Sequence, residues 1–174
     1  MSNIATMAAE FDSARFRHVL GHLPTGVVVV TGLNSGGEPF GITIGSFVSV
    51  SLEPPLVGFF PGLQSRSWPA IAEGKRFCAN ILSSAQSDEC WRFAKEPQEG
   101  GANRFDGLQW TKSANGMPVL PNSIGWIDCS VQSVTEAGDH WFVLGRVDHL
   151  HTTDSADEAM VFYKGKVAGV ETSE

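Results

Sequence analysis

The sequence has few cysteines and few basic residues. Among its 174 residues are only three cysteines, Cys78, Cys90 and Cys129, and none of them belongs to a C-x-x-C pair. An odd count with this spacing argues against a disulfide framework or a zinc knuckle, and favours reduced thiols in a cytoplasmic protein. Twelve basic residues face nineteen acidic ones, so the net charge is −7. We therefore expect no basic face for nucleic acid and no basic patch for an anionic membrane.

Several catalytic and targeting signatures are also missing. The sequence has no G-x-S-x-G elbow, no G-x-G-x-x-G turn and no G-x-x-x-x-G-K-[ST] loop, which argues against an α/β-hydrolase nucleophile, a Rossmann fold and a P-loop. Residues His18 to Gly37 carry no Asp, Glu, Lys or Arg, but Pro24 and several glycines interrupt this stretch. We therefore expect no membrane-spanning helix. The first ten residues lack the basic and then apolar order of a signal peptide.

Length and composition predict one folded domain. The mass is 18.7 kDa, and hydrophobic residues make up 42% of the chain against 18% charged residues. Such a chain can bury a core without help from disulfides or metals. No internal repeat or low-complexity linker divides it. We expect a single domain over residues 11–170, with residues 1–10 and 171–174 as tails.

The hydrophobic pattern predicts six or seven strands and two or three short helices. Helices are expected over Asp12–His22 with Asp12 as N-cap, over Ser67–Glu73, and from a capping box at Ser83 and Gln86 to about Ala94. Strands are expected at Val27–Thr31, Gly41–Leu52, Leu56–Phe60, Phe77–Leu82, Ser123–Val134, Trp141–Leu150 and Val161–Tyr163. Strands at this density, often joined without helices, predict a closed antiparallel barrel with the helices packed outside.

Three polar segments are candidates for a site. The strand from Thr43 to Ser51 carries hydroxyls at alternating positions beside Gly45. This pattern lets a flat polar ligand approach the backbone, although spacing alone favours an ordinary solvated strand face. Ser65-Arg66-Ser67 precedes a predicted helix, and the same residues suit either a phosphate site or a plain N-cap beside a surface charge.

Histidines supply the third candidate. Gly138-Asp139 fits a hairpin turn, but a turn does not explain His140, which can donate a hydrogen bond to a carboxamide or an anion. His149 and His151 share one face of a strand. Without further ligands nearby in the sequence, we expect exposed histidines there and no metal site.

In their order along the chain, these motifs resemble the flavin reductase-like family, which has the FMN-binding split-barrel fold. The resemblance covers about Phe16 to Val170 and implies a mainly β, antiparallel, Greek-key-like split barrel with a few short peripheral helices. It rests on Phe16-Arg17, Pro24-Thr25-Gly26-Val27, Gly41–Phe47, Ser49–Val57, Ser65-Arg66-Ser67, Phe77–Leu82, Gln86, Arg104-Phe105 and Gly138-Asp139-His140.

The resemblance also implies a role for each matching residue. The edge of the flavin ring and its ribityl chain would be lined by Thr43, Ile44, Gly45, Ser46 and Ser49, with Pro24 and Thr25 bordering the ring. The flavin phosphate would be held by Ser65, Arg66 and Ser67, and Phe105 would flank the flavin. His140 would be the catalytic residue near the nicotinamide or pyrophosphate of the pyridine nucleotide. Gly45 departs from the family pattern, which often has Asn there.

The activity implied by the resemblance is NAD(P)H-dependent reduction of FMN or FAD. The reduced flavin would pass to a larger flavin-dependent monooxygenase, and the reductase would be a cytoplasmic homodimer. NADH is favoured over NADPH because no patch of Arg or Lys suits a 2′-phosphate. Two alternatives stay open: an electron-transfer flavoprotein or ferric reductase of the same fold that holds FMN tightly, and a flavin- or haem-binding module without turnover.

Overall fold

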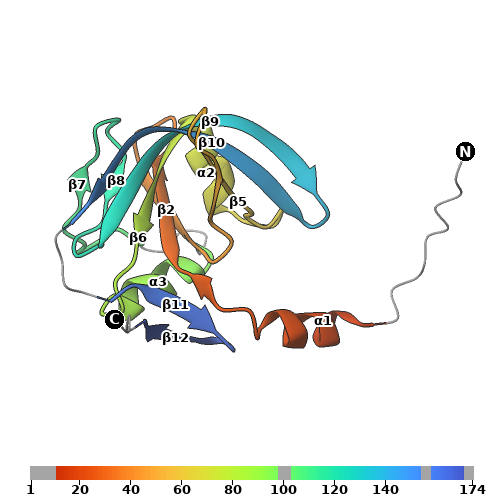
Figure 1. The fold of residues 1–174 in the computed structure, drawn as a ribbon. Helices are drawn as coiled ribbons and strands as arrows, with labels where there is room; N and C mark the ends of the chain where they lie inside the picture. Colours follow the sequence, from red (N-terminus) through yellow and green to blue (C-terminus); the bar gives the residue numbers. More distant parts are fainter. Residues whose placement is uncertain (1–10, 98–102, 154–157, 171–174) are drawn as a thin grey trace, which may run out of the picture.

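The largest unit of the fold is an antiparallel sheet of seven strands (Figure 1). The computed structural model describes residues 11–97, 103–153 and 158–170, so the two predicted tails lie outside the described residues. The strand order across the sheet is β3-β2-β6-β9-β10-β5-β4. The bounds are β2 Val28–Leu33, β3 Pro39–Ile44, β4 Val48–Ser51, β5 Leu56–Phe59, β6 Arg76–Ile81, β9 Gly125–Ala137 and β10 His140–Thr152.

The sheet is strongly curved because its two edge strands follow one another in the chain. β3 ends at Ile44 and β4 begins at Val48, so Gly45–Phe47 links opposite edges. A linker of this length spans about 14 Å at most, whereas a flat seven-stranded sheet would separate its edges by about 29 Å. The sheet therefore curls into a barrel, yet β3 and β4 do not pair in the strand order. The prediction of a closed barrel is wrong, and the mainly β split barrel is confirmed.

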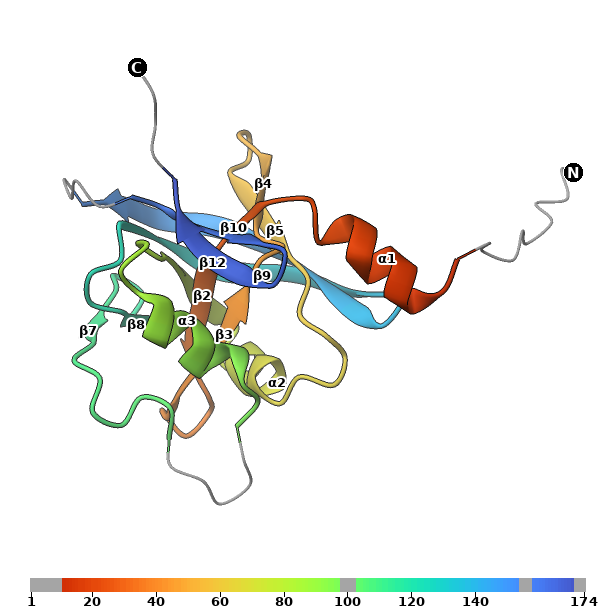
Figure 2. The same ribbon diagram turned by 90° about the horizontal axis from the view of Figure 1, so that it is seen from below.

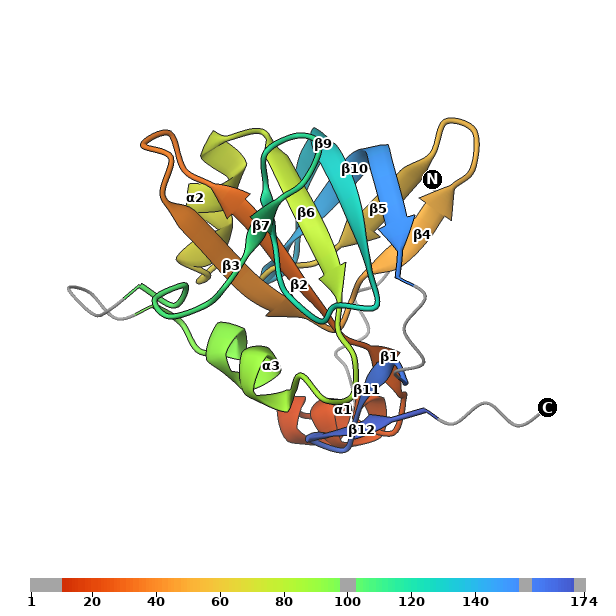
Figure 3. The ribbon, with the colours of Figure 1, turned by 90° about the vertical axis from the view of Figure 1, so that its left-hand side faces the viewer.

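Smaller elements surround this barrel. β1 (Thr25–Gly26), β11 (Met160–Tyr163) and β12 (Lys166–Gly169) form a second sheet, while β7 (Thr111–Lys112) pairs with β8 (Pro118–Val119). The helices are α1 (Ser13–Leu20), α2 (Ser67–Glu73) and α3 (Ser87–Ala94). α1 stands apart from α2 and α3, beside the small sheet (Figures 2 and 3). No helix in the described ranges is long and apolar enough to cross a membrane.

Buried apolar side chains form two clusters, and β2 contributes to both. Val28 and Val30 belong to the first cluster and Val29 to the second, because successive strand residues point to opposite faces. The first cluster lies inside the curved sheet and includes Phe59, Phe77 and, from α2, Trp68 and Ile71. The second packs α3 and β11 against the other face and includes Leu82, Cys90, Phe93, Phe105 and Met160.

Most predicted elements are present. The Asp12 carboxylate caps α1 by accepting a hydrogen bond from the Arg15 N–H at 2.7 Å, and α2 has the predicted bounds. The predicted strand Gly41–Leu52 is wrong as one element, because Gly45–Phe47 must leave one sheet edge to reach the other. These three residues, freed from strand pairing, lie within the candidate site.

The helix predicted from Ser83 begins later, at Ser87. The Gln86 side chain accepts a hydrogen bond from the Ser83 N–H at 2.9 Å, which is half of a capping box. The other half is absent, since the buried Ser83 hydroxyl has no hydrogen-bond partner in the described part of the chain. The Ser83–Gln86 turn therefore leads into α3 without being part of it.

Candidate functional site

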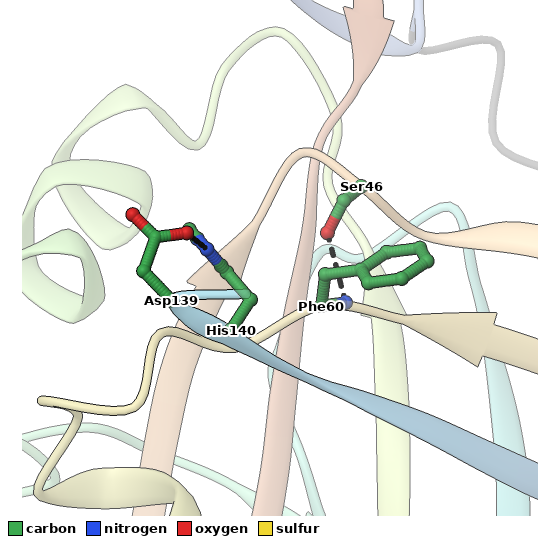
Figure 4. Close-up of polar contacts among 4 residues, drawn as sticks. All are labelled: Ser46, Phe60, Asp139 and His140. Carbon is green, nitrogen blue, oxygen red and sulfur yellow. Dashed lines mark hydrogen bonds and ion pairs between the residues drawn. The ribbon is translucent and has the colours of Figure 1, made fainter. Parts of the chain in front are cut away.

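The segment from Phe60 to Ser65, between β5 and α2, connects three of the predicted motifs. The Phe60 N–H donates a hydrogen bond to Ser46 Oγ at 3.0 Å (Figure 4). Gly62 forms an antiparallel bridge with His140, and the Ser65 N–H donates to the Gly62 carbonyl at 3.0 Å. Motifs that are distant in sequence are thereby attached to one short stretch of backbone.

The imidazole of His140 is oriented by its neighbour at the tip of the β9–β10 hairpin. Nδ1 lies 2.7 Å from Asp139 Oδ1 (Figure 4). The hydrogen bond and the charge of His140 lower the pKa of Asp139. An ionised carboxylate only accepts hydrogen bonds, so Nδ1 carries the proton of this contact. Nε2 lies beside Gly62, where a Cβ atom would be 4.0 Å away, and is available to a ligand. The sequence predicted Asp139 as a turn residue only.

Ser65, Arg66 and Ser67 differ in how much each can offer a ligand. Ser65 and Ser67 are buried, whereas Arg66 is exposed. Ser65 Oγ accepts a hydrogen bond from the Trp68 N–H at 3.2 Å, and Ser67 Oγ accepts one from Arg104. An anion at this segment would therefore meet the Arg66 guanidinium and the free Ser65 hydroxyl proton.

Arg104 fixes this segment in place, a role that the sequence did not reveal. Its guanidinium donates to Ser67 Oγ at 2.5 Å, to the Gly41 carbonyl at 2.6 Å and to the Phe93 carbonyl at 3.1 Å. It also lies 5.5 Å from the centre of the Phe93 ring. Burial lowers the pKa of Arg104. One side chain thus ties the start of α2 to β3 and α3, so the position of Ser67 depends on all three elements.

The predicted hydroxyl face from Thr43 to Ser49 divides into an internal and an accessible part. The Thr43 hydroxyl donates to the Cys90 carbonyl in α3 at 2.7 Å, and Ile44 is buried in the first core cluster. These two residues can offer a ligand little beyond their backbone. Gly45 and Ser49 are exposed and Ser46 is partly so, because the chain has left β3 at this point.

Phe105 lies in the core. Only 5% of its surface is exposed, and its ring centre is 5.0 Å from that of Phe93 and 6.1 Å from that of Trp110. The structure does not bring it to Ser46 or His140. The ring packs against these neighbours and leaves little of its face to a ligand, and its contact with the flavin stays a prediction.

A groove of about 790 Å³ lies beside Thr25 and Gly45. Its size falls in the range of small-molecule sites, about 300–1,000 Å³. A Cβ atom at Gly45 would lie 3.0 Å from Thr25 Oγ1, so the glycine keeps this end open; Pro24, next to Thr25, is exposed. The walls come from α1 and the β11–β12 hairpin: Phe16, Arg17, His18, Leu20, Gly21, His22, Leu23, Phe162, Lys164 and Gly165.

The geometry fits a flat aromatic ligand that carries a phosphate. The groove offers a mainly apolar wall, the glycine allows close approach to the backbone, and Arg66 supplies a cation just after the segment that bridges to His140. The described residues form no comparable site for a reactive thiol or a metal ion. The three cysteines are buried and free, and burial raises the pKa of Cys78 and Cys129. No three His, Cys, Asp or Glu side chains gather within the residues that the structure covers.

Comparison with known proteins gives the class to which this fold and site belong. Residues 20–171 match the flavin reductase like domain. The chain therefore belongs to the flavin reductase-like family, which confirms the family predicted from its motifs.

Individual relatives are similar over most of their length. A flavin reductase of Pseudomonas putida is 45% identical over 158 residues, which cover 91% of this chain and 90% of the relative. The reductase subunit of a flavin-dependent monooxygenase of Rhodococcus jostii is 41% identical over 167 residues, which cover 96% of this chain and 83% of the relative. The solved structure of the NADH:FAD oxidoreductase of Streptomyces globisporus superposes with a TM-score of 0.85 at 32% identity, over 94% and 95% of the two chains.

Proposed function

We propose that this protein is an NADH-dependent flavin reductase, which reduces FMN or FAD and supplies the product to a larger flavin-dependent monooxygenase. The observation that carries the proposal is the attachment of both Ser46 and His140 to the single segment Phe60–Ser65, which directly precedes Arg66. The relatives that are reductases, one of them a monooxygenase subunit, support the same activity.

The flavin ring lies, in this proposal, along the accessible part of the Gly45–Ser49 stretch, beside Pro24 and Thr25. Gly45 permits close approach of the ring to the backbone, and the groove beside it has apolar walls. Arg66 and the Ser65 hydroxyl bind the phosphate, and Arg104 holds Ser67 so that this segment keeps its shape. The bound flavin supplies the hydride-accepting chemistry, while the protein supplies orientation.

His140 positions the pyridine nucleotide. With Nδ1 engaged by Asp139, Nε2 is free to bind the carboxamide of the nicotinamide or the pyrophosphate. Because Gly62 lies directly beside Nε2, a nucleotide bound there approaches the ring from the side of the Phe60–Ser65 segment. Lack of an Arg or Lys patch in the sequence favours NADH over NADPH.

The protein acts as a cytoplasmic homodimer in this proposal. None of the residues of α1 is buried, and four apolar side chains in and after it, Phe16, Val19, Leu20 and Leu23, are 45–60% exposed. Phe16, Val19 and Leu20 share one face of α1, Leu23 follows just after the helix, and an apolar surface of this kind fits an interface between two copies related by twofold symmetry. Three of the four also line the groove beside Gly45, so the second copy would lie close to the flavin ring. The free cysteines suit a reducing compartment.

The test is a steady-state assay with purified protein, NADH and added FMN or FAD, followed at the NADH absorbance band. We expect NADH consumption that depends on free flavin and saturates with it. A protein that remains yellow after dialysis and does not consume NADH would instead be a flavin-binding or electron-transfer protein. Repeating the assay with NADPH determines which nucleotide is used.

A further inference from the structure

The segment that follows α3 supplies acceptors to two donors of Arg66, its backbone N–H and one nitrogen of its guanidinium. Glu96 Oε2 accepts a hydrogen bond from the Arg66 backbone N–H at 3.0 Å. The Arg66 guanidinium donates through Nη1 to the Pro97 carbonyl at 3.4 Å. Both groups of Arg66 that would bind a phosphate therefore have acceptors from Glu96-Pro97.

A carboxylate and a phosphate are alternative ligands for the same donors. Both are anionic oxygen acceptors that bind backbone N–H groups and arginine side chains. Since the two anions repel each other, a phosphate cannot form a strong hydrogen bond with the Arg66 N–H while the Glu96 carboxylate accepts from it.

We propose that Glu96 is a tethered competitor of the flavin phosphate and thereby sets the affinity of this reductase for phosphorylated flavins. The inference rests on the proposed function, since it needs a phosphate at Ser65-Arg66. A flavin that carries a phosphate displaces the Glu96 carboxylate from the Arg66 N–H, whereas riboflavin, which has no phosphate, leaves it in place. The competition weakens binding of FMN without closing the site.

The surroundings allow Glu96 to leave while the phosphate segment keeps its shape. Glu96 and Arg66 are both exposed, so their contact is screened by water and limits binding only modestly. Among the described residues, Lys95 precedes Glu96 in the chain, the Arg66 N–H binds its carboxylate, and the charge of Glu96 acts on Arg104. Arg104 donates to Ser67 Oγ and to the Lys95 carbonyl. The backbone next to Arg66 and the backbone next to Glu96 are therefore both anchored. A reductase that must release its flavin benefits from such reversible binding.

The test compares FMN with riboflavin, using quenching of flavin fluorescence to obtain both dissociation constants. Glu96→Gln keeps the size of the side chain and removes its charge, and Glu96→Ala removes the contact. We expect Glu96→Gln to tighten FMN about threefold and Glu96→Ala somewhat more, in line with an exposed ionic contact. Riboflavin should change by less than about twofold. Asp106→Asn is the matched control, since it removes one exposed charge from a side chain that forms no hydrogen bond or ion pair with the described residues.

The outcomes separate this inference from the proposed function. If Arg66→Ala lowers the preference for FMN over riboflavin but neither Glu96 variant alters it, the phosphate site stands and the competitor role is refuted. If Arg66→Ala leaves that preference unchanged, the phosphate site itself is wrong and the inference fails with it. Weaker FMN binding in Glu96→Gln would make Glu96 a support of Arg66, and equal changes for both flavins would indicate an effect through the fold. Either result overturns the proposal.

Discussion

The hydroxyl of Ser46 accepts a hydrogen bond from the backbone N–H of Phe60 at 3.0 Å (Figure 4). Ser46 lies in the linker that crosses between the edge strands β3 and β4, and Phe60 directly follows β5. The contact therefore fixes the accessible linker against the segment that carries Gly62 and Ser65. Loss of this hydrogen bond should loosen the site between the unpaired edge strands β3 and β4.

Replacing Ser46 with Ala should lower stability and weaken flavin binding together. The Phe60 N–H loses its protein acceptor, which costs about 0.5–1.5 kcal/mol. Urea unfolding measures the first effect, and a severalfold rise in the FMN dissociation constant is the second. Ser49→Ala provides the contrast, since the exposed Ser49 hydroxyl makes no hydrogen bond with the described residues, and we expect stability to be unchanged. Equal stability of the Ser46→Ala variant and the native protein would show that the contact does not hold the linker.

Replacing His140 with Ala should raise the Michaelis constant for NADH more than that for flavin. Loss of one hydrogen bond from Nε2 predicts a rise of roughly three- to tenfold. Steady-state kinetics with each substrate varied in turn measures both constants, and His149→Ala is the control because His149 is an exposed histidine of the same strand. Equal rises for the two substrates would assign His140 to the flavin site or to the fold.

Asp139→Asn tests the orientation of the same ring. Because the hydrogen bond from His140 lowers the pKa of Asp139, the ionised form is favoured by the contact. The contact is fully present above the usual pKa of a carboxyl group and is lost as the pH falls through the lowered pKa. At neutral pH we expect Asp139→Asn to raise the Michaelis constant for NADH less than His140→Ala does. A pH profile that is unchanged at its acidic end in the variant would remove Asp139 from this role.

Arg104→Lys should destabilise the fold and reduce the preference for FMN over riboflavin. A lysine cannot reproduce the planar fork that reaches Ser67, Gly41 and Phe93, and we expect a loss of roughly 2–3 kcal/mol. Urea unfolding measures this loss, and the two flavin dissociation constants report the displacement of the phosphate segment. Arg76→Lys, an exposed arginine on β6, is the control. An unchanged flavin preference in a folded, destabilised Arg104→Lys protein would limit Arg104 to a structural role.

Val19→Glu should dissociate the proposed homodimer. The charge falls on the exposed apolar face of α1, and Val19 is not among the residues that line the groove. Light scattering after gel filtration should show a change from dimer to monomer at low micromolar concentration. Ala14→Glu adds the same charge on the opposite face of the same helix and should leave the dimer intact. A native protein that is monomeric would contradict the interface directly.

The sequence by itself determined the elements whose signals are local. Asp12 caps α1 by binding the N–H of Arg15, only three residues further along the chain. α2 has the bounds that the pattern predicts, and Gly138 takes the positive φ of the predicted hairpin turn. The ordered motifs also indicated the family, because each of them is a short stretch of chain. These features depend on near neighbours, and near neighbours are visible in a sequence.

Only the tertiary structure decided which side chains reach the site. The curl of the sheet breaks the predicted strand at Gly45–Phe47, places Phe105 in the core, and turns the Thr43 hydroxyl toward α3. The contact of Glu96 with Arg66 likewise joins segments that no local pattern relates. The physical reason is that these contacts follow from closing a curved sheet between its own edge strands, a constraint that involves the whole chain at once.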